Sequence, residues 1–193
     1  MKNIRYNLGL HYDGDPCQWY GVSCSENEGN DIVGLYFSHF NMNNSIWQYV
    51  CKLPALQLLD LSDNGLQSPI PECVGSFANL KILRLSSNLL SESIPPQLFS
   101  MKNLSTLDLT HNQLTGPIPP QLFSLSNLAY LDLSYNNLSG NIPITLSNLR
   151  FIESLDISNN RLTGEIPEAL GNLSELHWLN LSHNKLTGQI PEA

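Results

Sequence analysis

One phrase of leucine, asparagine and proline recurs at a fixed interval along most of this chain. Six copies align, from LQLLDLSDNGLQSPIP at residue 56 to LHWLNLSHNKLTGQIP at residue 176, and a degenerate seventh copy precedes them. One equally spaced leucine marks the shared register of all seven: Leu35, Leu59, Leu83, Leu107, Leu131, Leu155 and Leu179. A fixed period of this length predicts a solenoid, because one unit cannot bury its apolar face until neighbours stack on it.

The L-x-L segment of each copy alternates inward and outward residues with a period of two, which predicts a short strand. Stacked copies then form a parallel sheet over a continuous leucine core. An Ile–Pro pair follows in each of the six clear copies, and the residue before a proline favours an extended backbone. We therefore expect the back of each coil to run extended and then to make a short 3₁₀ or α-helical turn.

An asparagine recurs five residues after the register leucine of each clear copy. Its carboxamide both donates and accepts hydrogen bonds, so it can pair backbone groups of adjacent turns that are otherwise buried without partners. We interpret these residues as a structural ladder and not as a binding site: Asn64, Asn88, Asn112, Asn136, Asn160 and Asn184.

The combined phrase L-x-x-L-x-L-S-x-N-x-L-T-G-x-I-P resembles the plant-type leucine-rich repeat. The phrase C-x-W-x-G-V-x-C, from Cys17 to Cys24, resembles the N-terminal cap of plant leucine-rich-repeat receptors and their soluble relatives. The resemblance implies an α/β-type leucine-rich-repeat solenoid: a right-handed superhelix with a parallel β-sheet on the concave face, 3₁₀ or short helices on the convex face and an N-terminal disulfide cap. It implies one domain, with the cap in residues 1–30 and about seven repeats in residues 31–193.

The four cysteines lie in the first part of the chain. In proteins with this cap the two cap cysteines are bridged, so the resemblance implies a Cys17–Cys24 disulfide, with Trp19, Tyr20 and Val22 covering the first coil. Cys51 and Cys73 are two residues short of one full repeat apart. A disulfide is geometrically feasible at that offset and resembles a pair found in plant receptor-like proteins, while two free buried thiols are the alternative.

Charge and composition restrict the classes of partner. The chain has 17 acidic residues against 9 lysines and arginines, a net charge of −8 and a pI of about 4.9, which argues against nucleic acid and anionic membranes as partners. No apolar run is long enough to span a bilayer, and Met1–Leu10 lacks the apolar core of a signal peptide. We expect no direct membrane insertion in this segment.

Asn-x-Ser/Thr sequons and paired cysteines favour an extracellular or cell-surface location, although a repeat rich in asparagine and serine also creates sequons by chance. The candidate glycosylation sites are Asn43, Asn103, Asn137, Asn172 and Asn180.

Outward strand positions form columns across the predicted sheet. One column holds the candidate binding residues Asp60, Arg84, Asp108, Asp132 and Asp156. Consecutive aspartates at strand spacing are expected to raise one another's pKa and to attract a cationic partner; the alternative is an ordinary solvated face. A second group places exposed aromatic and histidine side chains over the later repeats, as interface hot spots do, unless they are ordinary surface variation: His111, Tyr130, Tyr135, Trp178 and His183.

Catalytic chemistry is not expected. Ser, His and Asp are present, but His111 and His183 lie three coils apart, about 14 Å by strand spacing, and no hydrolase, metalloprotease or phosphate-loop motif occurs. His177 and His183 are too far apart on an extended strand to share a metal ion. We predict no enzyme activity, no cofactor and no metal site.

The function expected from these residues and the resemblance is recognition. The leading hypothesis is an extracellular module, similar to a plant receptor ectodomain, that binds a peptide or protein on its concave face, with a co-receptor as a further partner. The first alternative is an inhibitor of a cell-wall-degrading enzyme, similar to polygalacturonase-inhibiting proteins, although their usual repeat number and C-terminal cap are lacking. Ice binding, for which regular threonine arrays are lacking, and an engineered scaffold are the others. The sequence leaves the oligomeric state open.

Overall fold

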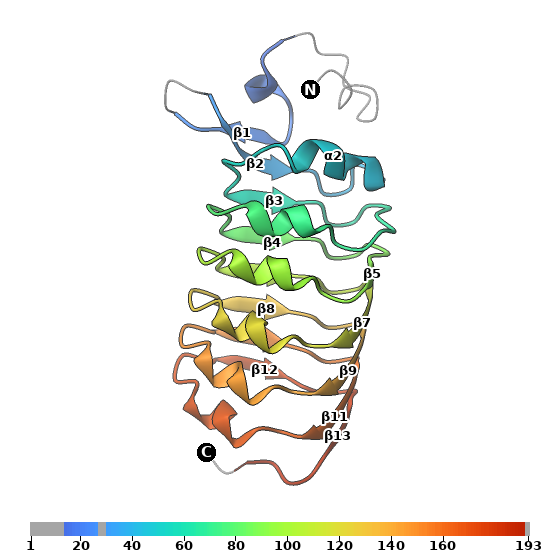
Figure 1. The fold of residues 1–193 in the computed structure, drawn as a ribbon, viewed down its shortest axis with the longest axis vertical. Coiled ribbons are helices and arrows are strands. Elements are labelled where there is room, and N and C mark those ends of the chain that lie inside the picture. Colours follow the sequence, from blue (N-terminus) through green and yellow to red (C-terminus); the bar gives the residue numbers. More distant parts are fainter. Residues whose placement is uncertain (1–13, 27–29, 192–193) are drawn as a thin grey trace.

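Parallel strands, one from each repeat, stack along the long axis of the molecule (Figure 1). The computed structural model describes residues 14–26 and 30–191. Two parts of the predicted cap, residues 1–13 and 27–29, therefore lie outside the described residues.

The first sheet lies on the concave face and has the strand order β1-β2-β3-β4-β6-β8-β10-β12. Its members are β1 (Val22–Cys24), β2 (Ile32–Tyr36), β3 (Leu58–Asp60), β4 (Ile82–Arg84), β6 (Thr106–Asp108), β8 (Tyr130–Asp132), β10 (Ser154–Asp156) and β12 (Trp178–Asn180). From β2 onward every pair is parallel and in repeat register, so that Leu59 pairs with Leu83. The predicted parallel sheet is confirmed.

The register leucines point inward and form the core. Leu59, Leu83, Leu107 and Leu155 are completely buried. Leu179 is the exception, at 43% exposed, because β12 has only β10 beside it in the sheet. The apolar core is therefore continuous from the cap to β10 and opens at the last described coil.

Short 3₁₀ helices form the convex face, as predicted. They are η2 (Asn44–Ile46), η3 (Glu72–Ser76), η4 (Pro96–Ser100), η5 (Pro120–Ser124), η6 (Ile144–Asn148) and η7 (Glu168–Asn172), and a single α-helical turn, α2 (Trp47–Val50), continues η2. From η3 to η7 the proline of the Ile–Pro pair precedes each helix in an extended conformation, as Pro119 does at φ −65° and ψ 130°. The fixed φ of proline thus sets where each coil turns.

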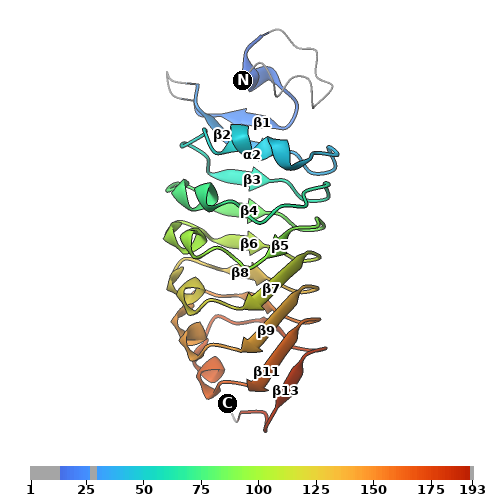
Figure 2. The same ribbon diagram turned by 45° about the vertical axis from the view of Figure 1, so that its right-hand side comes forward.

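A second sheet, which we did not predict, runs along one side of the solenoid (Figure 2). Its strands are β5 (Ser91–Glu92), β7 (Gln113–Pro117), β9 (Asn137–Asn141), β11 (Arg161–Glu165) and β13 (Lys185–Thr187). Here Gly116 pairs with Leu138 and not with Gly140, its equivalent in the next repeat, so the register differs by two residues from that of the first sheet. Each Thr-Gly glycine in this sheet has a positive φ, as Gly116 does at 78°.

The N-terminal cap combines η1 (Pro16–Gln18) with strand β1, which pairs antiparallel with β2. Disulfides join Cys17 to Cys24 and Cys51 to Cys73, so the alternative of free buried thiols is wrong. Trp19 is buried and Val22 packs against the core. Tyr20 does not cover the coil as expected: it is 78% exposed, with its ring beside that of Phe40.

Candidate functional site

The outward side chains of the concave sheet stand in the columns that the sequence predicts. Asp108 lies beside Asp132, and Asp132 beside Asp156, in the parallel register. At the two ends of this column, Arg84 lies between Asp60 and Asp108, and Asn180 lies beside Asp156. The predicted charge column is therefore continuous across the strands from β3 to β12.

Each aspartate of this column also holds the turn that follows its own strand. Oδ1 of Asp132 accepts hydrogen bonds from the Ser134 amide at 2.9 Å and from the Ser134 hydroxyl at 2.6 Å. The same backbone contact joins Asp60 to Ser62, Asp108 to Thr110 and Asp156 to Ser158. One oxygen of each carboxylate is therefore committed to local structure. The recurring Asp-x-Ser/Thr pattern in the sequence is typical of such turn contacts, but we did not predict them from it.

The other carboxylate oxygens have weaker or more exposed partners. Oδ2 of Asp132 accepts from the Tyr130 hydroxyl at 3.3 Å, and Oδ2 of Asp156 accepts from the Asn180 amide at 3.0 Å. The Arg84 guanidinium lies 3.8 Å from the Asp60 carboxylate. The aspartate column is thus partly paired within the protein and keeps oxygen atoms available at its outer edge.

Burial is the main cause of the raised pKa of two residues on this face, Asp108 and Tyr130. It raises the pKa of Asp108, while hydrogen bonds from Thr110 and Ser86 oppose the increase and the charge of Asp132 adds to it. Burial, together with the charges of Asp132 and Asp108, also raises the pKa of Tyr130 to about 12. The predicted repulsion between aspartates is present at Asp108, but it is a smaller cause of the raised pKa than desolvation.

The column beyond the strand ends has an unusual backbone. One residue per coil adopts the left-handed conformation, with φ between 51° and 63°: His39, Asp63, Ser87, His111, Tyr135, Asn159 and His183. Asn, Asp and His tolerate this region, whereas tyrosine is rarely found there. Periodicity predicts that these positions are equivalent but not that their backbone turns left-handed.

Two predicted site residues of this column form a rigid aromatic pair. The rings of His111 and Tyr135 stack with centroids 4.2 Å apart and planes 16° apart. Tyr135 is 50% exposed, and Tyr130, at the start of β8 in the same coil, is 38% exposed. Trp178 is exposed on β12, and the side chain of His183 has no hydrogen-bond or ring partner among the described residues. The structure thus gathers His111 and Tyr135 directly and leaves His183 apart.

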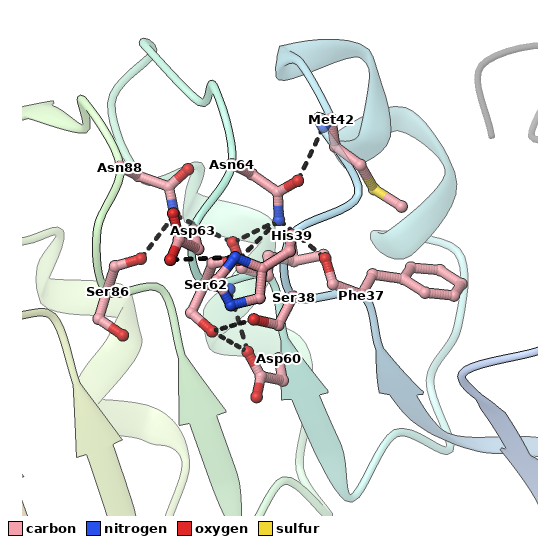
Figure 3. Close-up of polar contacts among 11 residues, drawn as sticks. Phe37, Ser38, His39, Met42, Asp60, Ser62, Asp63, Asn64, Ser86 and Asn88 are labelled. Carbon is pink, nitrogen blue, oxygen red and sulfur yellow. Dashed lines mark hydrogen bonds and ion pairs between the residues drawn. The ribbon is translucent and has the colours of Figure 1, made fainter.

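The repeated asparagines connect neighbouring coils. Figure 3 shows Asn64 near the start of the solenoid, where its amide donates to the Phe37 carbonyl and its carbonyl oxygen accepts from the Met42 amide, both at 2.8 Å. Asn88, Asn112, Asn136, Asn160 and Asn184 repeat this arrangement one coil further each time. The four from Asn88 to Asn160 are buried, so these side chains are unavailable to a ligand.

The five sequons lie on different faces. Asn180 is in the charge column, Asn137 accepts from Arg161 in the second sheet, and Asn103 donates to the Ala78 carbonyl. Asn43 caps η2, and Asn172 ends η7 on the convex face. Their glycosylation stays a prediction.

The described residues contain no group of three or more His, Cys, Asp or Glu side chains arranged to hold a metal ion. In that same part of the chain, none of the helices has the length and hydropathy needed to cross a bilayer.

Comparisons with known proteins identify the repeat and similar structures. Two family models described as leucine rich repeat match the chain, one at residues 78–138 and 102–162 and the other at residues 55–77 and 175–193. The plant peptide hormone receptor RGFR1 in complex with RGF2 is similar in structure, with a TM-score of 0.83 and 36% identity over 91% of this chain and 27% of that chain. Pollen receptor kinase 3 is similar with a TM-score of 0.81 and 31% identity over 91% of this chain and 85% of that chain.

Receptor-like protein 5 of Arabidopsis thaliana is a curated relative, 35% identical over 57 residues. The match covers 30% of this chain and only 20% of that protein, so the chain corresponds to a small part of its length. A plant ice-binding protein is also similar, with a TM-score of 0.63 and 27% identity over 98% of this chain and 86% of that chain. The chain belongs to the leucine-rich repeat family, with the fold of plant leucine-rich-repeat receptor ectodomains.

Proposed function

We propose that this chain is an extracellular recognition module that binds a peptide or protein ligand, without catalysis, on the concave face between β6 and β12. A second protein, acting as a co-receptor, is the further partner we expect to contact the bound ligand or the rim of this face. Asp108, Asp132, Tyr130 and Tyr135 lie at its centre.

The exposure of Tyr130 and Tyr135 carries this proposal. Tyr130 begins β8 and Tyr135 lies in the turn that follows this strand. Leu131 and Leu133, between the two tyrosines, are buried in the core and anchor the backbone that carries both rings. Exposed aromatic side chains on a rigid face provide a large contact area at a small cost in conformational entropy, which is why they dominate binding hot spots. Trp178 extends the same face by two strands.

Charge favours a ligand with basic groups. The chain has a net charge of −8, and the aspartate column places carboxylates beside the aromatic rings. A lysine or arginine of the ligand would gain from the potential of this face and from contact with a tyrosine ring.

The similar proteins and the disulfides support the class and the location. One solved neighbour is a peptide hormone receptor in a complex, and one curated relative is receptor-like. Two disulfides and no free cysteine are typical of secreted or cell-surface proteins. An extracellular site of action is therefore part of the proposal.

The test is affinity capture of peptides from extracellular extract on the immobilised protein, with mass spectrometry of what is retained. The repeats supply substitutions that the fold already accepts: Tyr130→Ser copies Ser154, Tyr135→Asn copies Asn159, and Trp178→Thr copies Thr106. We expect wild type to retain a distinct set of peptides and the triple variant to lose them.

A matched control is Phe151→Asn, which copies Asn127. It removes another exposed aromatic ring, located before β10 and outside the concave columns. It should retain the same peptides as wild type. The same peptides on the triple variant, or none on wild type, would refute the concave-face proposal.

The alternative functions make separate predictions. Ice binding is tested by thermal hysteresis of a concentrated sample, and the second sheet argues against it because exposed Arg161, Glu165 and Lys185 interrupt its threonines. Inhibition of a cell-wall-degrading enzyme is tested directly on a fungal pectinase digest. We expect neither effect.

A further inference from the structure

A continuous chain of hydrogen bonds runs from the charge column to the rim of the concave face. The Ser134 hydroxyl lies 2.6 Å from Oδ1 of Asp132, and the Thr110 hydroxyl lies 2.8 Å from that of Ser134. The same Thr110 hydroxyl lies 3.1 Å from Nδ1 of His111. Four side chains from two adjacent coils are therefore linked in series.

The number of available protons determines which group donates in each of these hydrogen bonds. An ionised carboxylate only accepts hydrogen bonds, so the single hydroxyl proton of Ser134 is directed at Asp132. Thr110 must then donate its own proton to Ser134, which leaves the Thr110 oxygen as an acceptor toward His111. All three contacts are satisfied together only if Nδ1 of His111 carries a proton. In the neutral ring, Nε2 is then an acceptor.

The ring of His111 is also held in place. It stacks on Tyr135, and its backbone has the left-handed φ of 52° shared by this column. The side chain is exposed, and no hydrogen bond to Nε2 is found among the described residues. An oriented acceptor with its lone pair free of intramolecular partners therefore stands at the rim, beside the tyrosine ring.

We propose that Thr110 and Ser134 are positioning residues that keep His111 protonated on Nδ1, so that its Nε2 accepts a hydrogen bond from an N–H or O–H group of the ligand. The ligand part rests on the proposed function of the concave face. The tautomer part does not, because it follows from the contacts within the protein alone.

Two other histidines of the same column are internal references. His183 has nearly the same backbone, with φ 53°, but the Ser182 hydroxyl beside it donates to Asn180 and makes no bond to the ring. His39 has Nδ1 3.1 Å from the Asp63 carboxylate, an acceptor that requires a proton on Nδ1 (Figure 3). We therefore expect His39 and His111 to share one tautomer, and His183 to show the mixture found in free histidine.

The test is a long-range proton–nitrogen NMR spectrum of the labelled protein at about pH 8, above the usual histidine pKa of about 6.5. His111 should show a protonated Nδ1 and an unprotonated Nε2. Thr110→Val, which keeps the shape and removes the acceptor, should shift His111 toward the free mixture. Ser134→Ala releases the Thr110 proton to donate to Nδ1, so it should favour the opposite tautomer, while His183 stays unchanged in both variants.

A wild-type His111 protonated on Nε2, or a tautomer unaffected by Thr110→Val, overturns the positioning role. The ligand part is read from the peptides that the immobilised wild type retains: His111→Asn, which suits the left-handed backbone and lacks Nε2, should weaken their binding about tenfold, the loss of about one hydrogen bond. Equal binding overturns that part. If wild type retains no peptide, the proposed function and the ligand part both fail, and the NMR spectrum still decides the tautomer.

Discussion

The carboxamide of Asn136 donates to the carbonyl oxygen of Leu109, in the preceding coil, at 2.9 Å. It also donates to the Leu133 and Ser134 carbonyls of its own turn and accepts from the Leu114 amide. One side chain thus joins two coils through buried backbone groups, which lose this partner when the side chain is removed.

Asn136→Ala is therefore expected to lower the free energy of unfolding by about 1–3 kcal/mol, because buried backbone groups lose their hydrogen bonds. Asn184→Ala is the matched control: it occupies the same position, but Asn184 is only half-buried and water can replace its bonds. Urea unfolding of both variants measures the difference. A ladder without a structural role would leave the Asn136→Ala midpoint at the wild-type value.

A second prediction concerns Glu92, which has a φ of 64° where later coils have glycine. A left-handed backbone costs a residue with a Cβ about 1–2 kcal/mol. Glycine avoids this cost, but it loses more conformational entropy on folding, which offsets part of the gain in stability. Glu92→Gly should therefore stabilise the protein by about 0.5–1 kcal/mol in urea unfolding.

The reciprocal change tests the same argument. A Cβ at Gly116 would lie 3.7 Å from the Cβ of Ser93, an ordinary contact. Gly116→Ala therefore reports the backbone conformation alone and should cost about 1 kcal/mol. Unchanged stability in both variants would show that the second sheet does not need this conformation.

A third prediction follows from the raised pKa of Asp108. The folded chain holds this proton more tightly than the unfolded chain, so the free energy of unfolding falls as the pH rises from the ordinary pKa of 3.8 through the higher folded pKa. Asp108→Asn removes this pH-dependent loss of stability. It also keeps the turn, since an asparagine at the equivalent position, Asn180, accepts the same hydrogen bond from the Ser182 amide.

Thermal unfolding from about pH 3 to pH 7 measures the effect, because the aspartate charge develops in this interval. We expect the variant to gain stability relative to wild type as the pH rises. A difference that is constant with pH, or that favours wild type at pH 7, would contradict the role given to burial of this carboxylate.

A fourth prediction concerns the disulfides. Alkylation of the denatured, unreduced protein should label no thiol, since all four cysteines are paired. Replacing Cys51 and Cys73 together by alanine should cost about 3 kcal/mol, because their bond closes a longer loop than that of Cys17 and Cys24, for which we expect about 2 kcal/mol. Four labelled thiols would contradict both pairings.

Much of the fold was predictable because a solenoid makes most of its contacts between neighbouring repeats. A constant repeat length places Leu59 beside Leu83 in any parallel stack, and the burial of both follows from their alternation with Asp60 and Arg84. The Ile–Pro pairs likewise predicted the 3₁₀ turns, since proline restricts its own φ and the residue before it.

The second sheet was not predicted. Its strands pair Gly116 with Leu138 and not with the equivalent Gly140, and a constant repeat length does not reveal such a shift between two faces of one coil. Tyr20 was placed wrongly for a related reason: the cap occurs once, so no repeated pattern indicates which of its aromatic residues turns inward.

The candidate site was likewise predictable only in part. The sequence alone determined which residues share a column and a register, since periodicity specifies equivalence between coils. Only the tertiary structure decided that Asp132 uses one oxygen to hold its own turn, that Tyr135 adopts a left-handed backbone, and that its ring stacks on His111. The sign of φ and the direction of a side chain depend on contacts with the adjacent coil, and those contacts exist only once the coils have stacked.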